Sequence, residues 1–164
     1  MDVGTFAKRI AETERAEKKI IDEAFLGGLL HDVGKLILAA NLPAQFKQAI
    51  SISREKNILL HDAEMELFST SHAEMGGYLM GLWGLPDSII ESIIFHHNPN
   101  NFIIDDFSPV TAVHAANVLA HENNYENPAE CLHEIDNEYL SKIGLMDKIS
   151  LWREKCCLEK TAMA

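Results

Sequence analysis

Residues 29–38 read Leu-Leu-His-Asp-Val-Gly-Lys-Leu-Ile-Leu, an apolar stretch that contains an imidazole, a carboxylate and an ammonium group. Burying His31 beside Asp32 is costly unless a partner compensates their polarity, and a divalent cation held by imidazole nitrogen and carboxylate oxygen is such a partner. If the turn stays close to helical, His31, Asp32 and Lys35 project toward one side. Gly34 allows another backbone or a ligand to come close. The stretch therefore predicts a metal with a cationic side chain beside it, which suits a bound phosphate.

The length and charge of the chain narrow the class of protein. At 164 residues it fits one domain, large enough to bury about 70% of the surface of its unfolded chain. Its 14 basic and 25 acidic residues give a net charge of −11. This charge argues against a non-specific nucleic-acid binder, because such a protein needs a basic face. It leaves open a phosphorylated small molecule as a ligand, since one local lysine can outweigh a distant net charge.

The sequence favours a cytoplasmic location. No apolar run approaches the roughly 20 residues that span a bilayer. The first residues are also too highly charged for a secretory signal. The three cysteines form neither a disulfide framework nor a CxxC metal site; they are Cys131, Cys156 and Cys157. We therefore expect a reduced, cytoplasmic protein that binds neither nucleic acid nor a membrane.

Apolar residues recur at helical spacing in nearly every segment, and no segment alternates convincingly as a strand. Ser71 and Glu74 form a predicted capping box at the start of one helix. Residues 98–107 form a polar loop suited to the border of a cleft, and residues 122–136 are acidic and poorly patterned. The sequence predicts an all-α bundle. The expected helices lie at about 6–11, 20–29, 43–57, 60–68, 71–83, 89–97 and 109–119, with short segments around 139 and at 146–158.

The dipeptide His-Asp occurs twice, and the two copies lie in different surroundings. His61-Asp62 sits near Glu64 at the start of an acidic helix, so we expect this copy at the surface. His31-Asp32 is flanked by leucine and valine, where solvent exposure does not explain it. Two interpretations of the second copy remain open, a pair of metal ligands or a structural hydrogen bond in the core.

Three further histidines are candidates for the same site. His72 is the first residue of the helix that the capping box opens, where the positive end of the helix dipole keeps the ring neutral and able to bind metal. An exposed histidine in the first turn is the alternative. His96 and His97 end an apolar helix, and adjacent side chains diverge by about 100°, so both reach one cavity only by straddling the inward face. For one of them the alternative is an imidazolium stabilised at a helix C-terminus.

The helix that starts near residue 109 carries two more polar candidates. Asn117 offers a neutral oxygen and His114 a ring nitrogen, so either can lie beside the histidine cluster. For His114 we favour a packed polar residue. His121 and His133 lie in polar surroundings, and we assign them no role.

With these residues in this order, the chain resembles the HD superfamily of helical metal-dependent phosphohydrolases. More narrowly it is similar to the HDOD branch, the HD-related output domains of bacterial signalling proteins. The similarity covers residues 6–119 and implies an HD-domain-like helical bundle. It rests on Gly-Leu-Leu-His-Asp-Val-Gly-Lys-Leu at 28–36, Ser-His-Ala-Glu-Met-Gly at 71–76, Trp-Gly-Leu-Pro at 83–86 and the His96-His97 pair.

The resemblance implies a set of ligands for one or two divalent ions, such as Fe, Mn, Zn, Ni or Mg. His31 and Asp32 correspond to the ligands that give the superfamily its name. His72 and the pair at 96–97 match positions that hold a second metal in the dinuclear HD phosphodiesterases. Lys35 matches the lysine that contacts the substrate phosphate.

The chain also departs from the family pattern. The family's first ligand is a histidine well before the His-Asp pair, and residues 1–30 contain none. Asn117 stands where the family has its last ligand, an aspartate, and a neutral amide weakens cation binding. Residues 98–101 replace the Gly-Tyr-Pro signature of the cyclic-dinucleotide phosphodiesterases. HDOD domains usually carry a further helical half on the N-terminal side. We therefore expect 1–164 to be a single HDOD-like domain that lacks this half, as a piece or a shortened relative of a larger regulator.

These observations lead to two candidate functions. The remaining alternative is a helical domain whose histidines serve only packing and capping. The first is a signalling output module that answers an upstream sensory or receiver domain by changing its contacts with a protein partner; this does not require a complete ligand set. The alternative is hydrolysis of a phosphoester. There Asp32 helps to hold a metal that activates water, and Lys35 neutralises the growing charge on the phosphate.

Overall fold

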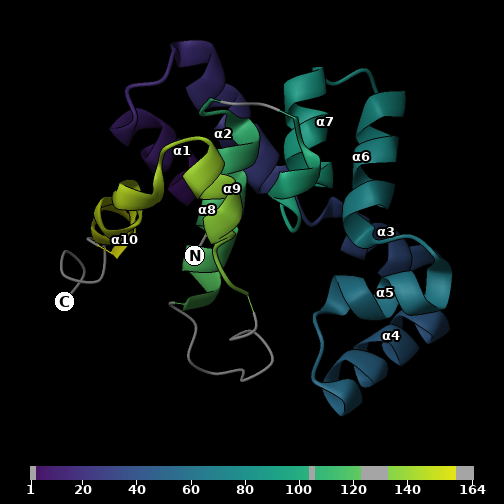
Figure 1. The fold of residues 1–164 in the computed structure, drawn as a ribbon. Helices are drawn as coiled ribbons and strands as arrows, with labels where there is room; N and C mark the ends of the chain where they lie inside the picture. The colour runs from purple at the N-terminus through teal and green to yellow at the C-terminus, as the bar shows by residue number, and fades with distance from the viewer. Residues whose placement is uncertain (1–2, 104–105, 123–132, 158–164) are drawn as a thin grey trace, which may run out of the picture.

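The computed structural model describes residues 3–103, 106–122 and 133–157. Every regular element within these ranges is a helix (Figure 1), so the all-α prediction is confirmed. The elements are α1 (Val3–Thr13), α2 (Lys18–Leu30), α3 (Val33–Asn41), α4 (Pro43–Lys56), α5 (Leu60–Phe68), α6 (His72–Leu82), α7 (Asp87–Ile94), the 3₁₀ turn η1 (Pro99–Asn101), α8 (Pro109–Glu122), α9 (Asn137–Lys142), the 3₁₀ turn η3 (Met146–Lys148) and α10 (Ile149–Cys157).

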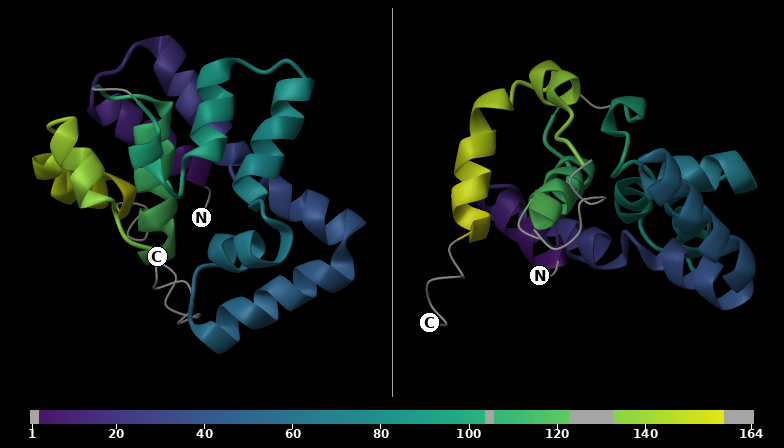
Figure 2. Two further views of the ribbon diagram at one scale, coloured as in Figure 1. Left: turned by 45° about the vertical axis from the view of Figure 1, so that its right-hand side comes forward. Right: turned by 90° about the horizontal axis from the view of Figure 1, so that it is seen from below.

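The helices form two neighbouring groups (Figures 1 and 2). In the first group, α1, α2, α8, α9 and α10 enclose the larger apolar core. In the second, a smaller core lies between α6 and α7 and extends to Leu30 and Val33 at the α2–α3 turn. Contacts of α7 with both α2 and α8 join the groups, and α4 and α5 pack on each other at the far end of the second. The α2–α3 turn therefore lies at the seam between the groups.

The larger core is built around α8, whose residues 109–119 are all buried. Small side chains at Ala112, Ala115 and Ala116 let α1 and α2 approach this helix closely. The large side chains that fill the remaining space include Phe6 and Trp152, both almost fully buried. α8 is therefore the central helix of the larger core.

A close backbone contact sets the distance between α3 and α6. A Cβ atom on Gly34 would lie 1.9 Å from the carbonyl oxygen of His72. Gly76 faces the same contact from α6, since its Cβ would lie 3.2 Å from the backbone nitrogen of Gly34. Only glycine at position 34 permits this approach. The expectation that Gly34 admits another backbone is confirmed, and the contact places the first turn of α6 beside the α2–α3 turn.

Most of the predicted helix boundaries are confirmed. α5 covers Leu60–Phe68, and α4 starts at Pro43 and ends before Asn57, which adopts a left-handed conformation with φ 53°. The capping box is present: the hydroxyl of Ser71 accepts from the backbone N–H of Glu74, and the Glu74 carboxylate accepts from the backbone N–H of Ser71.

The predicted helix at 89–97 is too long at its C-terminal end. α7 ends at Ile94, and His96 lies beyond it. The His96 ring donates from Nδ1 to the carbonyl of Ile93 at 2.7 Å, which occupies an acceptor of the last turn. Pro99 then disfavours helical backbone at the preceding residue. The two histidines therefore sit on an irregular segment rather than on the helix.

Some expectations concern residues outside the described ranges. Cys131 and most of the acidic segment 122–136 fall there. Cys156 is buried in the larger core. Among the described residues, no helix combines the length and the apolar character needed to cross a bilayer.

We predict that Gly34→Ala lowers the free energy of unfolding by about 3 kcal/mol, because the added methyl group meets backbone that cannot move aside without separating α3 from α6. Gly81→Ala is the matched control. Its Cβ would lie 3.7 Å from Ile90 Cδ1, an ordinary contact, and alanine is favoured over glycine in a helix interior by about 0.8–1 kcal/mol. Urea unfolding followed by circular dichroism measures both. Equal stability of the two variants would contradict the close contact.

Candidate metal centre

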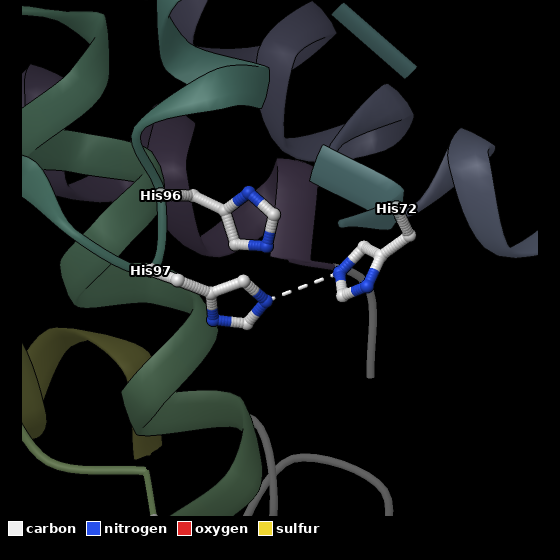
Figure 3. A group of neighbouring side chains, drawn as sticks. All are labelled: His72, His96 and His97. Carbon is white, nitrogen blue, oxygen red and sulfur yellow. Dashed lines mark hydrogen bonds between the residues drawn. The ribbon is translucent and has the colours of Figure 1, made fainter. Parts of the chain in front are cut away.

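Five side chains point into one space where three segments meet. The α2–α3 turn supplies His31 and Asp32, the start of α6 supplies His72, and the segment after α7 supplies His96 and His97. Figure 3 shows the last three of these side chains. The predicted convergence of these residues is thus present in the fold, and their role as metal ligands stays a prediction.

The ring nitrogens and the carboxylate in this space are close together. Nε2 of His72 lies 3.1 Å from Nε2 of His97 and 3.3 Å from Oδ1 of Asp32. Nε2 of His31 lies 3.4 Å from Oδ2 of Asp32. The rings of His31 and His96 meet edge to face, with their centroids 5.1 Å apart. Such spacing is compact enough for several of these atoms to share one ion.

Backbone carbonyls fix the tautomers of two of the histidines. Nδ1 of His31 bonds to the carbonyl of Gly28 at 2.8 Å, and Nδ1 of His96 bonds to the carbonyl of Ile93 at 2.7 Å. A carbonyl oxygen only accepts, so each Nδ1 carries the proton and each Nε2 keeps a free lone pair. Metal-ligating histidines use their second nitrogen in this way. Both rings are thereby prepared to bind a cation through Nε2.

Glu64 on α5 orients His72. This carboxylate is completely buried, and its Oε2 accepts from Nδ1 of His72 at 2.6 Å and from the backbone N–H of the same residue at 2.7 Å. The second bond also satisfies one of the free N–H groups at the start of α6, where a negative charge is favourable. Since Nδ1 is occupied, Nε2 of His72 faces Asp32 and His97. A carboxylate behind an imidazole is a common support of metal-binding histidines.

Two buried polar atoms in the cluster have no hydrogen-bond partner in the described part of the chain; they are Nε2 of His96 and Oδ1 of Asp32. Oδ1 of Asp32 lies 3.3 Å from Nε2 of His72, but this contact lacks hydrogen-bond geometry. Leaving such groups unsatisfied costs about 1–3 kcal/mol each. A divalent cation would satisfy both. Two sets of groups have their ligand atoms within 4.8 Å of one another; they are His72, His96 and His97, and His31, Asp32 and His96. The donor set therefore fits a divalent metal ion.

The charge states of most of these groups are those that bind metal. Burial lowers the pKa of His31 despite the neighbouring Asp32. Burial and neighbouring imidazoles hold the pKa values of His96 and His97 well below the ordinary value, so both rings are neutral at pH 7. The alternative that one of them is an imidazolium at a helix C-terminus is therefore wrong. Burial acts to raise the pKa of Asp32, but its contact with His72 and the charges of its neighbours lower it overall.

His72 differs from the expectation derived from the helix dipole. Burial favours the neutral ring, but the contacts with Asp32 and Glu64 outweigh burial and raise the pKa of His72. The prediction of a neutral ring considered the helix N-terminus alone, and in the metal-free chain the two carboxylates act in the opposite direction. A cation bound at Nε2 would compete with protonation of that nitrogen.

The prediction that His61-Asp62 lies at the surface is wrong for His61. This residue is only 8% exposed, and its ring stacks on that of His97 with the centroids 4.1 Å apart. Its acidic neighbour Glu64, on which the surface prediction rested, is buried as well. A signal for the burial of Glu64 was present in the sequence, because Leu60, Ala63, Glu64 and Leu67 follow the i, i+3, i+4, i+7 spacing of one apolar helix face.

Further histidines extend the cluster outward. The rings of His97 and His133 stack with centroids 5.5 Å apart, and those of His133 and His121 stack at 4.1 Å. Burial and the adjacent His121 lower the pKa of His133 to about 3. Neither histidine was assigned a role from the sequence, since contacts between residues so far apart along the chain arise only from the fold.

The structure agrees with the interpretation of His114 as a packed polar residue. Its Nδ1 donates to the carbonyl of His96 at 2.8 Å, and its Nε2 accepts from the backbone N–H of Asp136 at 3.0 Å. Both nitrogens are occupied, so none is left for a metal. Asn117 is buried one turn further along α8, and its role as a ligand stays a prediction.

Lys35 lies at the rim of the cluster. Its Nζ is 2.8 Å from Oδ2 of Asp32, and the side chain is 29% exposed. A partly exposed cationic side chain beside Asp32 is suited to contact an anion that approaches the cluster.

The fold and this site define a helical domain with a buried cluster of histidines around one aspartate. The chain belongs to the HDOD domain family, since the family model matches residues 1–99, a range that contains all five clustered residues. The resemblance inferred from the motifs is confirmed.

Solved structures share this fold. An HDOD domain protein of unknown function from Geobacter sulfurreducens is 25% identical with a TM-score of 0.69, over 93% of this chain and 58% of that one. A proposed phosphohydrolase from Shewanella amazonensis SB2B is 20% identical with a TM-score of 0.64, over 94% of this chain and 58% of that one. A proposed signal transduction protein from Marinobacter aquaeolei VT8 is 20% identical with a TM-score of 0.56, over 94% of this chain and 35% of that one.

A curated relative is an uncharacterized protein of Treponema pallidum (strain Nichols). It is 32% identical over 95 residues, which make up 58% of this chain and 18% of that protein. The chain thus spans less than two thirds of the length of each of these proteins.

We predict that Glu64→Ala lowers the free energy of unfolding of the metal-free chain by about 3 kcal/mol. It leaves two N–H donors of His72 without their charged acceptor, and hydrogen bonds to charged groups contribute about 1.5–3 kcal/mol each. Glu66→Ala is the control on the same helix, because it removes only an exposed ion pair with Lys56 and should change stability by less than about 1 kcal/mol. Thermal or urea unfolding distinguishes them, and similar small losses would refute the role of Glu64.

Proposed function

We propose that this chain is a regulatory output domain of bacterial signal transduction whose state depends on a divalent metal ion held by His31, Asp32, His72, His96 and His97. The observation that carries the proposal is the set of Nε2 atoms turned toward one carboxylate by bonds at the opposite ring nitrogens. Membership of the HDOD family and the likeness to a proposed signal transduction protein support the regulatory part.

The donor set indicates which metals suit the site. Imidazole nitrogens outnumber carboxylate oxygens, and Asn117 would add a neutral oxygen. Nitrogen-rich sites favour Fe, Mn, Zn or Ni over Mg, because Mg prefers oxygen ligands and keeps several waters. We therefore place Mg last among the candidates.

A metal at this position would act on the arrangement of the helices. The five residues come from three segments that the chain separates by dozens of residues, and they meet at the seam between the two helix groups. A ligand that binds only the assembled arrangement stabilises it by an amount that grows with the ligand concentration. Metal binding would thus favour one arrangement of the two helix groups at their seam. A sensory or receiver domain, or another protein partner in the cytoplasm, would respond to this change in arrangement.

The incomplete ligand set favours regulation over catalysis. Residues 1–30 contain no histidine, although the resemblance places the family's first ligand there. An amide at Asn117 in place of a carboxylate lowers the negative charge of the site. Fewer charged ligands hold fewer cations or hold them more weakly. A domain that only changes its contacts tolerates this loss, whereas phosphoester hydrolysis depends on tightly placed charge.

A metal-dependent phosphohydrolase is the second candidate, and the position of Lys35 favours it. When bound, the metal would supply Lewis acidity; Asp32 would help to hold it, and Lys35 would bind and neutralise the phosphate group. Turnover of a generic phosphodiester or a cyclic dinucleotide with Mn²⁺ or Fe²⁺, lost in Lys35→Met, would support this candidate. A metal-loaded protein that turns over neither substrate would leave the regulatory domain standing.

The two His-Asp dipeptides offer a matched test of the metal site. We expect near-stoichiometric Fe, Mn, Zn or Ni in the wild type purified without added metal, measured by elemental analysis. Asp32→Ala, alone or with His31→Ala, should remove it, because it takes away the carboxylate at the centre of the cluster. Asp62→Ala changes the equivalent residue of the other dipeptide, which is half exposed, and should keep the metal. Equal metal content in Asp32→Ala and the wild type would show that the ligand assignment is wrong.

A further inference from the structure

One side of α6 is apolar and open to solvent. Tyr78 is 71% exposed and Leu82 66%, and Trp83, the residue that follows the helix, is 68% exposed. Nearly all of α6 is apolar, and a helix of this composition is ordinarily buried on every side. Tyr78 and Leu82 lie one turn apart on the same side of α6, and contiguous exposed apolar side chains mark an interaction surface. α6 therefore carries an apolar face that the described residues leave uncovered.

A groove of about 380 Å³ lies beside this face, between α6 and α7. The two helices run antiparallel at one edge of the molecule (Figures 1 and 2). The residues that line the groove are mostly apolar; they include Gly77, Gly81 and Leu82 from α6 and Ile90 and Ile94 from α7. Ile94 packs directly against Gly77, whereas a Cβ atom on Gly81 would meet only Ile90 Cδ1, at 3.7 Å. The open part of the groove therefore lies at Gly81, where a side chain of an incoming helix has room.

Acidic side chains lie beside this groove, which we call the α6–α7 groove. Glu74 belongs to its lining. On α7, Asp87 and Glu91 share one helix face with Ile90 and Ile94, since the four residues follow the spacing i, i+3, i+4 and i+7. Apolar lining and carboxylates thus occur on the same face of α7.

No positive side chain balances these carboxylates in the surrounding sequence. Between Lys56 and Lys142 the chain contains no lysine or arginine. Burial and the nearby Asp87 raise the pKa of Glu91, so the two carboxylates are close enough to repel each other. A lysine or arginine of a partner placed beside them would relieve this repulsion. The surface therefore selects for a positively charged ligand.

We propose that the α6–α7 groove binds an amphipathic helix of a partner protein, with apolar side chains inserted at i, i+3 or i+4 and i+7 and lysine or arginine residues flanking them. Binding of such helices in apolar grooves is a general mode of recognition. The charges would speed association and select the partner, and the apolar contacts would hold it. The proposal does not depend on a metal at the histidine cluster.

Two other occupants fit the same surface less well. A second copy of this chain would bring acidic residues against acidic residues, in a protein of net charge −11. An anionic membrane surface would repel the carboxylates for the same reason. The apolar groove and the one-sided charge together match a basic helix.

A helical peptide library tests the proposal. Peptides of about 20 residues, long enough to be helical, are displayed on phage, selected on the wild-type chain and counter-selected on Gly81→Leu. Leucine at this position fills the groove without a backbone clash, since the Cβ would lie 3.7 Å from Ile90 Cδ1. The enriched peptides should have apolar residues at helical spacing and flanking lysine or arginine. Their binding is then measured from the fluorescence of exposed Trp83, while Trp152 is fully buried.

Two variants and their controls separate the apolar and charged contributions. Gly81→Leu should weaken binding by about tenfold or more, while Gly81→Ala keeps most of it. Glu91→Lys should weaken binding severalfold, more so at low salt, whereas Glu138→Lys on α9 should have no effect. The proposal is overturned if no peptide is enriched, if enriched peptides lack basic flanks, or if Gly81→Leu leaves binding unchanged. It is also overturned if the chain dimerises and Gly81→Leu abolishes the dimer, because the occupant is then a second copy.

Discussion

The contact between the backbone of Gly34 and the carbonyl of His72 determines where the histidine cluster can form. It brings α3 and α6 together so closely that a single methyl group at position 34 would not fit. The α2–α3 turn and the start of α6 are thereby held side by side, and Asp32 and His72 come within 3.3 Å. The remaining ligand candidates are added by α7, which leads His96 and His97 back to the same place.

Hydrogen bonds made behind the rings turn this proximity into a defined donor set. The carbonyls of Gly28 and Ile93 and the carboxylate of Glu64 each hold one Nδ1 atom. Each ring therefore presents Nε2 to the shared space, and burial keeps most of the rings neutral. The resulting unsatisfied atoms cost stability in the metal-free chain. The ligand atoms are therefore already in place, but leaving them without a cation lowers the stability of the surrounding helices. Binding of a cation would remove this cost and stabilise the helices around the site.

The sequence was sufficient for the fold class, most helix boundaries and the five clustered residues, because these depend on local periodicity and on motifs that are contiguous in the chain. It was insufficient for Glu64 and His61. Their acidic neighbours suggested a solvated helix, and the partner that makes burial of Glu64 favourable, His72, lies beyond the next turn of the chain. The same applies to the pKa of His72, which burial lowers and which carboxylates from two other elements raise overall. The apolar periodicity of α5 indicated that Glu64 lies on a buried face, but the acidic composition favoured the opposite interpretation. The tertiary contacts that make burial of this charge favourable are not visible in the local sequence.

The two helices that form the α6–α7 groove also border the histidine cluster, since α6 begins at His72 and α7 ends just before His96. A partner at the groove and a metal at the cluster would therefore act on the same pair of helices. The central claim is that the histidine cluster holds a metal, and anomalous diffraction from a crystal grown with Zn²⁺ and measured at its absorption edge tests it most directly. The predicted result is a dominant peak about 2.0–2.1 Å from Nε2 atoms of the clustered histidines. Peaks confined to surface carboxylates, with the cluster free of metal, would contradict it.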